Sequence, residues 1–293
     1  ERLARAAEKK LRGNFLSNLL SSRAERVEAA LELLRQALDR CKLAKDWRRC
    51  QALNEQCAEL CADVNELREA GDFSAEAGEC ALRAGDGAAA REQFKRAAET
   101  HKRAGAFDLA AHSLRKVGDA LEREDEPKLA AHFLREAAEL YGLAKYHTTD
   151  AQKLQVRVAD LCAQAFDDPA QLREAIAGYE AVCEAYLANN LLRFHAKDLF
   201  VRAVVVFLLL EDEIGAAKSL ERYCERDPSL SSAYERKFLE AAIAAAGRRD
   251  AAEFDAACAQ LMKRVSLEEV LRRMLTRVKL GLAGPEAAGE DPL

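Results

Sequence analysis

The sequence predicts an all-α protein, built as an array of about fourteen antiparallel helices, and three observations support this prediction. Alanine makes up about a fifth of the 293 residues, with Leu, Glu and Arg also abundant, and these residues lose least on entering a helix. Only 14 glycines and 5 prolines are present, which leaves little material for the turns of an all-β protein. Apolar residues recur at intervals of three and four, as in Leu31, Leu34 and Leu38, so each helix has one buried face.

Helix boundaries are marked by proline and glycine. Pro127, Pro169 and Pro228 fit the first turn of a helix, because proline breaks a helix interior. An Asp beside a glycine predicts a turn followed by a helix cap at Gly71-Asp72 and at Gly85-Asp86. Further turns are predicted at glycines 87, 105 and 247. Between these marks the pattern predicts helices of roughly 12 to 24 residues joined by short turns.

A long internal repeat relates the predicted helices to one another. Small residues beside one large residue, the pattern typical of stacked helical hairpins, occur three times. The three sets are Ala90, Phe94, Ala97, Ala98 and Glu99; Ala130, Leu134, Ala137, Ala138 and Glu139; and Ala175, Tyr179, Val182, Cys183 and Glu184. Their spacing exceeds the period of about 34 in tetratricopeptide repeats (TPR), so we expect a TPR-like right-handed superhelix with longer helices and a C-terminal helical bundle.

The pattern also predicts how the chain is divided. We expect residues 1–190 to form the TPR-like array, 191–282 a C-terminal helical part continuous with it, and 283–293 a flexible acidic tail. The longest apolar run, Ala203 to Leu210, is shorter than the ~20 residues of a membrane span and is interpreted as a buried helix. Arrays of this kind offer extended surfaces rather than a deep catalytic cleft.

Charge and cysteine content exclude some classes of function. With 45 basic and 50 acidic residues the net charge is −5, which argues against a dedicated nucleic-acid binder. Nine scattered cysteines are typical of buried thiols in a reducing cytosol. Cys57 and Cys61 could be half of a metal site, but no CxxC or HExxH motif supplies the other half. We therefore interpret them as small core residues and expect no metal and no cofactor.

The segment 14–20 fits neither a helical nor a strand period. It contains four large apolar residues, Phe15, Leu16, Leu19 and Leu20, interleaved with Ser and Asn. One interpretation is a hydrophobic staple that packs against the first hairpin. The other is an exposed loop that inserts into a bilayer, with the five basic residues before it attracted to an anionic leaflet. Four such side chains give at most about 6–12 kcal/mol, before the cost of ordering the loop, so the anchor would be weak and reversible.

Basic residues recur at the repeat spacing. Pairs four residues apart share a helix face, and successive pairs are separated by 40 or 41 positions. These residues, the basic stripe, are His112 and Lys116, Lys153 and Arg157, Arg193 and Lys197, and Lys237. The alternative is an ordinary solvated face, since 32% of the residues are charged. A ladder on alternate helices predicts an elongated acidic partner, with each exposed pair worth only ~0.2–1 kcal/mol and weakened by salt.

The helical pattern stops after Leu282. The last residues include Glu290, Asp291 and a terminal Leu293. Most such tails are merely disordered. An acidic cluster that ends in Leu is also a plausible peptide for a basic, partly apolar groove.

Four segments, in the same order and spacing, resemble one family. Leu192–Asp198 (LRFHAKD) resembles its LLKYSAKD segment, and Lys42–Trp47 (KLAKDW) resembles its KMAKNW. Phe15–Leu20 resembles its FFSGLF-like membrane loop, and Met274–Lys279 resembles its final helix. The sequence is therefore similar, from about Ala7 to the tail, to the soluble NSF-attachment proteins, specifically the alpha type.

This resemblance implies a role. Members of the family wrap the four-helix SNARE bundle, made of syntaxin-like and partner SNAREs, and recruit the hexameric ATPase NSF that disassembles it. They hydrolyse nothing themselves, and they are cytoplasmic proteins associated peripherally with the cytosolic face of membranes. The SNARE-contacting residues implied by the resemblance are Lys153, Arg157, Arg193 and Lys197.

The resemblance also implies an NSF-binding end, with departures from the family. The implied NSF-binding residues are Leu293, Asp291, Glu290 and Glu211. A SNARE-contacting Lys of the family is replaced by His112, whose charge depends on pH. The acidic turn of the family that faces NSF is replaced by Gly247-Arg248-Arg249, whereas Glu211 to Glu213 keep an acidic turn nearby.

Two other classes of function fit the sequence less well. A generic TPR scaffold for acidic peptides needs a compact Lys/Asn cluster, whereas the basic residues are spread over more than a hundred positions and the 14–20 segment stays unexplained. An enzyme needs a phosphate loop, a nucleophile elbow or paired carboxylates, and no such motif is evident, so no catalytic residue is predicted.

Overall fold

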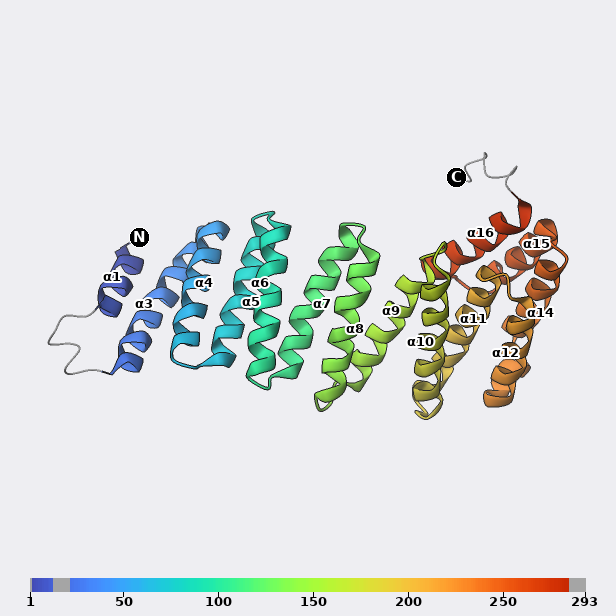
Figure 1. The fold of residues 1–293 in the computed structure, drawn as a ribbon, viewed down its shortest axis with the longest axis horizontal. Coiled ribbons are helices and arrows are strands. Elements are labelled where there is room, and N and C mark those ends of the chain that lie inside the picture. The colour runs from blue at the N-terminus through green and yellow to red at the C-terminus, as the bar shows by residue number, and fades with distance from the viewer. Residues whose placement is uncertain (1, 13–21, 285–293) are drawn as a thin grey trace. The chain divides into compact units, whose positions relative to one another are not determined.

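The structure, a computed structural model, describes residues 2–12 and 22–284 (Figure 1). These residues form fifteen α-helices and no strand, which confirms the all-α prediction. Within the described part of the chain, no helix is both long and apolar enough to cross a bilayer. The helices are α1 (Arg2–Arg12), α3 (Arg23–Leu43), α4 (Trp47–Asp63), α5 (Leu67–Arg83), α6 (Gly87–Arg103), α7 (Phe107–Arg123), α8 (Pro127–Leu143), α9 (Thr148–Ala163), α10 (Pro169–Leu187), α11 (Arg193–Leu209), α12 (Glu213–Arg226), α13 (Pro228–Ser231), α14 (Tyr234–Gly247), α15 (Ala251–Met262) and α16 (Glu269–Ala283).

The chain forms two compact units, residues 1–151 and residues 152–293. The first holds α1 to α8 and the second holds most of α9 and the helices that follow it. Residue 190, the expected end of the array, lies between α10 and α11, two helices of the second unit that pack against each other. A division at that position stays a prediction.

Unit 1 repeats a single hairpin geometry. Helices α4 to α8 begin at residues 47, 67, 87, 107 and 127, so each hairpin occupies 40 residues, the spacing of the sequence repeat. The turns repeat too, because residues 45, 65, 85, 105 and 125 all have a φ between 55° and 80°. In each turn the next amide donates to a carbonyl five residues back, as in Asp86 N–H to Ala81 O at 2.9 Å, which closes the end of the preceding helix.

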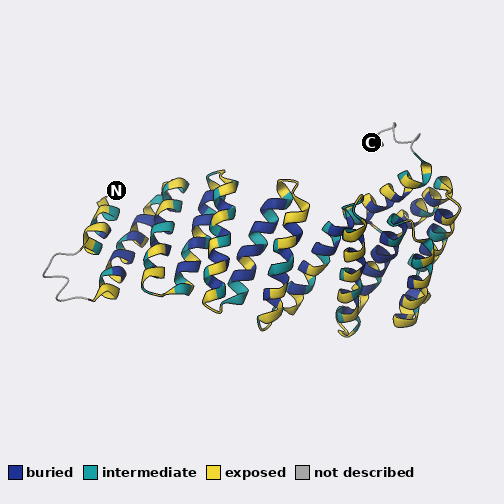
Figure 2. Ribbon diagram, viewed as in Figure 1, coloured by how far each residue is buried: buried dark blue, intermediate teal, exposed yellow. Residues whose placement is uncertain are grey.

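Small residues at the repeat positions let neighbouring helices of unit 1 pack closely. Ala90, Ala97 and Ala98 of α6 are at most 2% exposed, and Phe94 fills the groove beside them. The matching residues of α8 and, in unit 2, of α10 are buried in the same way. Figure 2 shows the result as buried positions on the inner faces of the helices, with exposed residues on the outer faces and turns.

One predicted turn is wrong. Gly71 and Asp72 lie inside α5, and Gly71 is buried rather than at a helix end. A Cβ at this position would lie 2.3 Å from the Cδ2 atom of His101, a residue of α6 that is 1% exposed. The glycine is therefore needed for close helix approach, whereas Gly85 and Asp86 do form the predicted turn and cap.

Unit 2 is organised around α11. Its segment Ala203–Val206 is at most 1% exposed, as expected for the apolar run, and the helix packs against α10, α12, α14 and α16. Arg202, also buried, donates to Asp160 of α9 and to Glu268, the residue that precedes α16, each at 2.6 Å. Pro169 and Pro228 begin α10 and α13, and Pro127 begins α8 of unit 1, as predicted.

Candidate functional site

The basic stripe occupies alternate helices within unit 2. Lys153 and Arg157 lie on α9, Arg193 and Lys197 on α11, and Lys237 on α14. Arg202 of α11 donates to Asp160 of α9, so these two helices lie side by side with residues 42 positions apart at the same level. The basic pairs on the two helices are 40 positions apart, which is nearly the same separation. The two pairs therefore lie at about the same level along neighbouring helices.

Acidic residues of the same unit face part of the stripe. Lys197 Nζ lies 2.8 Å from Glu235 Oε1, and the Glu235 side chain is 12% exposed. Arg193 lies 4.0 Å from the buried Asp227, whose Oδ1 caps α13 by accepting the Ser229 N–H. These contacts hold the two basic side chains in place and neutralise part of their charge. Lys153 and Lys237 are exposed and have no ion pair with another described residue.

His112 and Lys116, the residues of the stripe that belong to unit 1, lie on α7. Lys116 Nζ lies 2.9 Å from Glu79 of α5, so this cation is also partly neutralised. His112 is exposed, and its Nδ1 lies 3.3 Å from the guanidinium of Arg115. Partial desolvation of its ring by neighbouring side chains lowers the pKa of His112, and the positive charges of Arg115 and Lys116 lower it further. The imidazole is therefore neutral near pH 7.

Two apolar residues beside the stripe were missed in the sequence. Leu191 and Phe194 are 85% and 81% exposed and flank Arg193 at the start of α11. The Asn189 side chain accepts the Leu191 N–H at 2.9 Å and fixes the turn that presents them. In the sequence they are a Leu and a Phe three residues apart with an Arg between them. Apolar residues at this spacing also occur on the buried face of a helix, so the pattern cannot show that these two are exposed. Large exposed apolar side chains beside cations are typical of a protein-binding surface.

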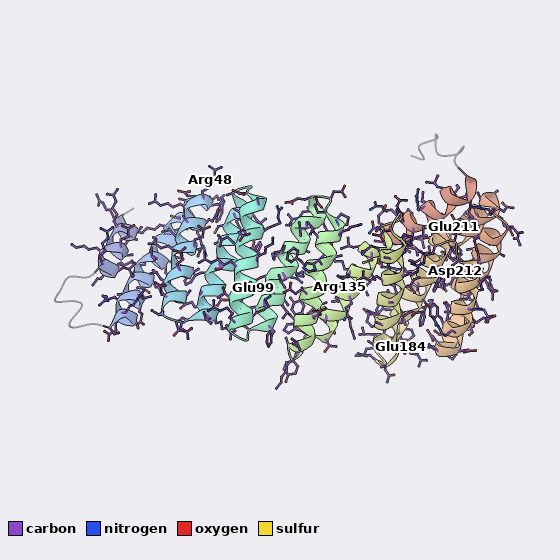
Figure 3. The ribbon with its side chains drawn as sticks, in the orientation of Figure 1. Arg48, Glu99, Arg135, Glu184, Glu211 and Asp212 are labelled. Atoms are coloured by element: carbon purple, nitrogen blue, oxygen red, sulfur yellow. The ribbon has the colours of Figure 1, made fainter. Side chains whose placement is uncertain are left out.

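At another position in unit 2, an acidic turn and a basic turn meet. Glu211, in the turn between α11 and α12, lies 3.8 Å from the guanidinium of Arg249, in the turn between α14 and α15. Asp212 is used as the cap of α12, where it accepts the Gly215 N–H at 2.7 Å. Figure 3 shows Glu211 and Asp212 at this turn. The predicted NSF-binding residue Glu211 is thus paired with one of the arginines that replace the family's acidic turn.

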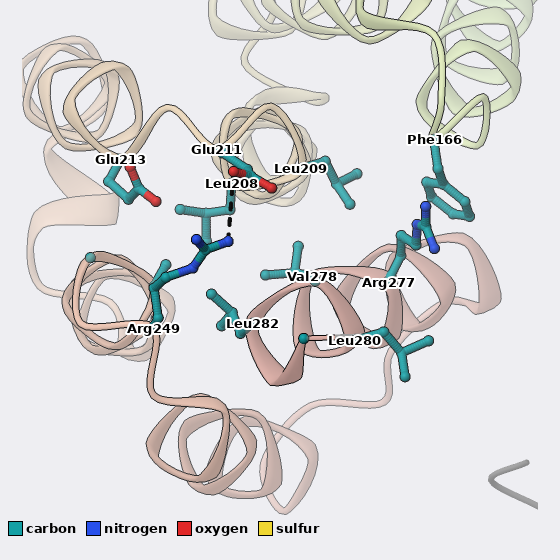
Figure 4. Close-up of a pocket in the computed structure, with 14 residues that line it drawn as sticks. Phe166, Leu208, Leu209, Glu211, Glu213, Arg249, Arg277, Val278, Leu280 and Leu282 are labelled. Carbon is teal, nitrogen blue, oxygen red and sulfur yellow. Dashed lines mark ion pairs between the residues drawn. The ribbon is translucent and has the colours of Figure 1, made fainter. Parts of the chain in front are cut away.

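A groove of about 640 Å³ lies beside these turns and α16 (Figure 4). Leu208, Leu209 and Val278 contribute apolar surface, and Arg277 holds its guanidinium 5.9 Å from the ring of Phe166. Glu211 and Arg249 also line it, so a ligand in the groove would contact apolar side chains together with an acidic and a basic side chain. Such a surface suits a peptide segment with mixed apolar and charged side chains.

Several predicted site residues lie outside the described residues. These are the membrane-loop residues Phe15, Leu16, Leu19 and Leu20, and the C-terminal residues Glu290, Asp291 and Leu293. Their roles stay predictions.

The cysteines considered for a metal are core residues of unit 1. Burial raises the pKa of Cys57 and of Cys61 to about 12 in each case, so both remain thiols at neutral pH. Among the described residues, no group of three His, Cys, Asp or Glu side chains could hold a metal ion.

Stacked helical hairpins with a charged, partly apolar outer surface define the class of helical-repeat binding proteins. Comparison with known proteins gives the family: residues 1–283 match the model "Soluble NSF attachment protein, SNAP", so the chain belongs to the SNAP family. An alpha-soluble NSF attachment protein of Vitis vinifera is 26% identical, over 99% of this chain and 96% of its own. Its Mus musculus counterpart is 26% identical over 96% and 93% of the two chains. The vesicular-fusion protein SEC17 of Komagataella phaffii is 25% identical over 100% and 98%.

Proposed function

We propose that the protein is an adaptor, without catalysis of its own, that binds post-fusion SNARE bundles and recruits and stimulates the NSF ATPase for their disassembly. Membership of the SNAP family and the names of the relatives, which include vesicular-fusion proteins, support this proposal. The partners would be the SNARE four-helix bundle, an NSF-type hexamer and, through the 14–20 segment, a membrane surface.

The observation that carries the proposal is the surface of unit 2 formed by α9, α11 and α14. It combines the basic residues of the stripe that belong to unit 2 with the exposed Leu191 and Phe194. A coiled-coil-like bundle presents acidic side chains and apolar grooves along its length, so both kinds of contact would be used. Each ion pair is weak, and affinity would come from their number and from several copies around one bundle.

The NSF-binding end is proposed for the acidic turn at Glu211 and the residues Glu290, Asp291 and Leu293. The ion pair between Glu211 and Arg249 means that the acidic turn is not free in this chain. We therefore expect weaker dependence of NSF recruitment on Glu211 than on the C-terminal residues.

The test is a pull-down of the full chain with an assembled SNARE bundle, with and without NSF, at two salt concentrations. We expect salt-sensitive binding to the bundle, followed by NSF recruitment and faster ATP hydrolysis by NSF. ATP hydrolysis by the chain alone would contradict the adaptor role. Binding of neither partner would favour the alternative, a generic TPR scaffold for acidic peptides.

A further inference from the structure

The segment Lys42–Trp47, one of the four that carried the family resemblance, has no part in the proposed function. It forms the turn between α3 and α4 in unit 1. We propose that this turn is a second membrane contact of unit 1, which binds the anionic headgroups of a bilayer surface. The inference rests on the membrane contact in the proposed function but uses different residues.

The tip of the turn is apolar and aromatic. Leu43, the last residue of α3, is 86% exposed, among the most exposed large apolar side chains in the described chain. Trp47, the first residue of α4, is half-buried, and the guanidinium of Arg83 lies 4.8 Å from its ring. An exposed Leu and an indole beside basic groups are typical of segments that lie in the membrane interface.

The turn is basic although the chain is acidic. Residues 39–49 carry five basic and two acidic side chains, whereas the whole chain has a net charge of −5. Lys42 is paired with Glu76 at 3.1 Å. Arg40, Lys45 and Arg48 are exposed and form no ion pair with another residue in the described part of the chain. Their charges are therefore available to an anionic surface outside the protein.

The shape of the turn favours a bilayer over a peptide. Lys45 has a φ of 55°, so the chain reverses over three residues, and residues 43–46 at the tip are all exposed. An extended acidic peptide needs a groove to bury its backbone, whereas headgroups can arrange themselves around an exposed tip. Figure 3 shows Arg48 projecting at this edge of unit 1.

The neighbouring helix α1 adds a cation at the same edge of unit 1. α1 packs against α3 through Ala7, with Leu3 and Leu11 against the same core. Its exposed cations include Arg2 in the first turn, and Lys9, Lys10 and Arg12 in the last turn. α1 begins at the edge of unit 1 where the α3–α4 turn lies (Figure 1). Arg2, in the first turn of α1, therefore lies at the same edge as the α3–α4 turn, whereas Lys9, Lys10 and Arg12 lie in the last turn of α1.

The α3–α4 turn and residue 22, where the described chain resumes after the 14–20 segment, lie at opposite ends of α3. α3 has 21 residues, which correspond to about 31 Å, and the turn lies at its C-terminal end while residue 22 lies at its N-terminal end. Two weak contacts joined by a rigid helix bind one surface more tightly than either alone and fix the orientation of the unit.

The chain supplies its own reporter, because Trp47 is its single tryptophan. The full chain is mixed with vesicles of phosphatidylcholine, with and without phosphatidylserine, that carry a spin label at the headgroup. We expect binding to the phosphatidylserine vesicles to quench Trp47 fluorescence, and the neutral vesicles to quench it much less.

The variant that tests the basic residues is the triple reversal Arg40→Glu, Lys45→Glu and Arg48→Glu. We expect it to lower vesicle affinity at least about tenfold and to abolish the quenching. The matched control, Arg103→Glu, Lys218→Glu and Lys263→Glu, changes the net charge equally at exposed positions elsewhere and should leave both measurements within about twofold of the original protein. Circular dichroism confirms that each variant is folded.

The outcomes separate this inference from the proposed function. If the chain sediments with vesicles and Trp47 is not quenched, the membrane contact stands and the turn is not part of it. If the triple reversal weakens binding to a SNARE bundle but not to vesicles, the turn contacts protein and the inference is overturned. Absence of any vesicle binding would overturn the inference together with the membrane contact at 14–20.

Discussion

Gly71 lies inside α5, where its missing side chain makes room for the ring of His101. We expect Gly71→Ala to lower the free energy of unfolding by about 1–3 kcal/mol, because the buried ring cannot move aside without displacing α6. The control is Gly142→Ala in α8, where an added Cβ would meet nothing within 4 Å and should stabilise by up to about 1 kcal/mol. Urea unfolding measures both, and equal stability of the two variants would contradict the packing argument.

His112 is the residue of the stripe whose charge depends on pH. Its pKa is lowered by partial desolvation of its ring and then by Arg115 and Lys116, so it gains a proton only as the pH falls below its usual titration range. Binding of the protein to an acidic bundle should therefore strengthen as the pH falls from about 7.5 to about 5.5. His112→Lys supplies a permanent charge, so it should bind up to about fivefold more tightly at the higher pH and respond less to acidification. Titrations of the bundle at several pH values test this, and an unchanged affinity at the higher pH would exclude His112 from the interface.

At the scale of the element, the helices were predictable, whereas two of the five hairpin turns of unit 1, at Lys45 and Asn65, were not. The hairpin turns of unit 1 share one backbone geometry with a positive φ, yet only residues 85 and 105 are glycines. Lys45, Asn65 and Asp125 adopt the same conformation with ordinary side chains, because the helices on either side impose it. The sequence marks these turns by glycine at residues 85 and 105 and by Pro127 after residue 125, and it marked a false one at Gly71, where glycine serves packing.

The contacts of Arg202 hold the C-terminal helix against the rest of unit 2. The pKa of Asp160 is raised, because burial outweighs the opposing effects of Arg202 and of the Tyr179 hydroxyl, which donates to it at 2.6 Å. Arg202→Met would leave this carboxyl buried without its cation, so we expect a loss of about 3–5 kcal/mol in the free energy of unfolding. The loss should be larger at high pH, where Asp160 must be ionised, and smaller at low pH, where it takes up a proton.

Arg273, on helix α16, is a matched control for Arg202, whose contact with Glu268 holds the start of that helix. Arg273 of α16 donates to Gln164 at 2.7 Å from an exposed position, and Arg273→Met should cost no more than about 0.5 kcal/mol. Hydrogen exchange of the α16 amides should rise in Arg202→Met and not in Arg273→Met. Similar exchange in both variants would show that α16 is held by its apolar face alone.

At the scale of the whole molecule, the sequence identified the cations of the candidate site but not their surroundings. Spacing alone placed the basic pairs on alternate helices, because a repeat converts sequence separation into spatial position. It could not identify Glu79, Asp227 and Glu235 as their counter-ions, since these acids come from other helices and follow no period. Nor could it find the exposed Leu191 and Phe194, which depend on how one turn is folded.

Two charge-reversal variants can show whether affinity for a SNARE bundle depends on the basic stripe or only on the net charge of the chain. Lys153→Glu with Arg157→Glu lowers the net charge by four and removes one pair of the stripe. Lys218→Glu with Lys263→Glu lowers it by the same amount at exposed positions outside the stripe. If binding depends on the pattern, the first variant should lose affinity for a SNARE bundle by about tenfold or more, and its affinity should vary less with salt. The second should stay within about twofold of the original protein. Equal losses in the two variants would mean that long-range repulsion, rather than the stripe, controls association.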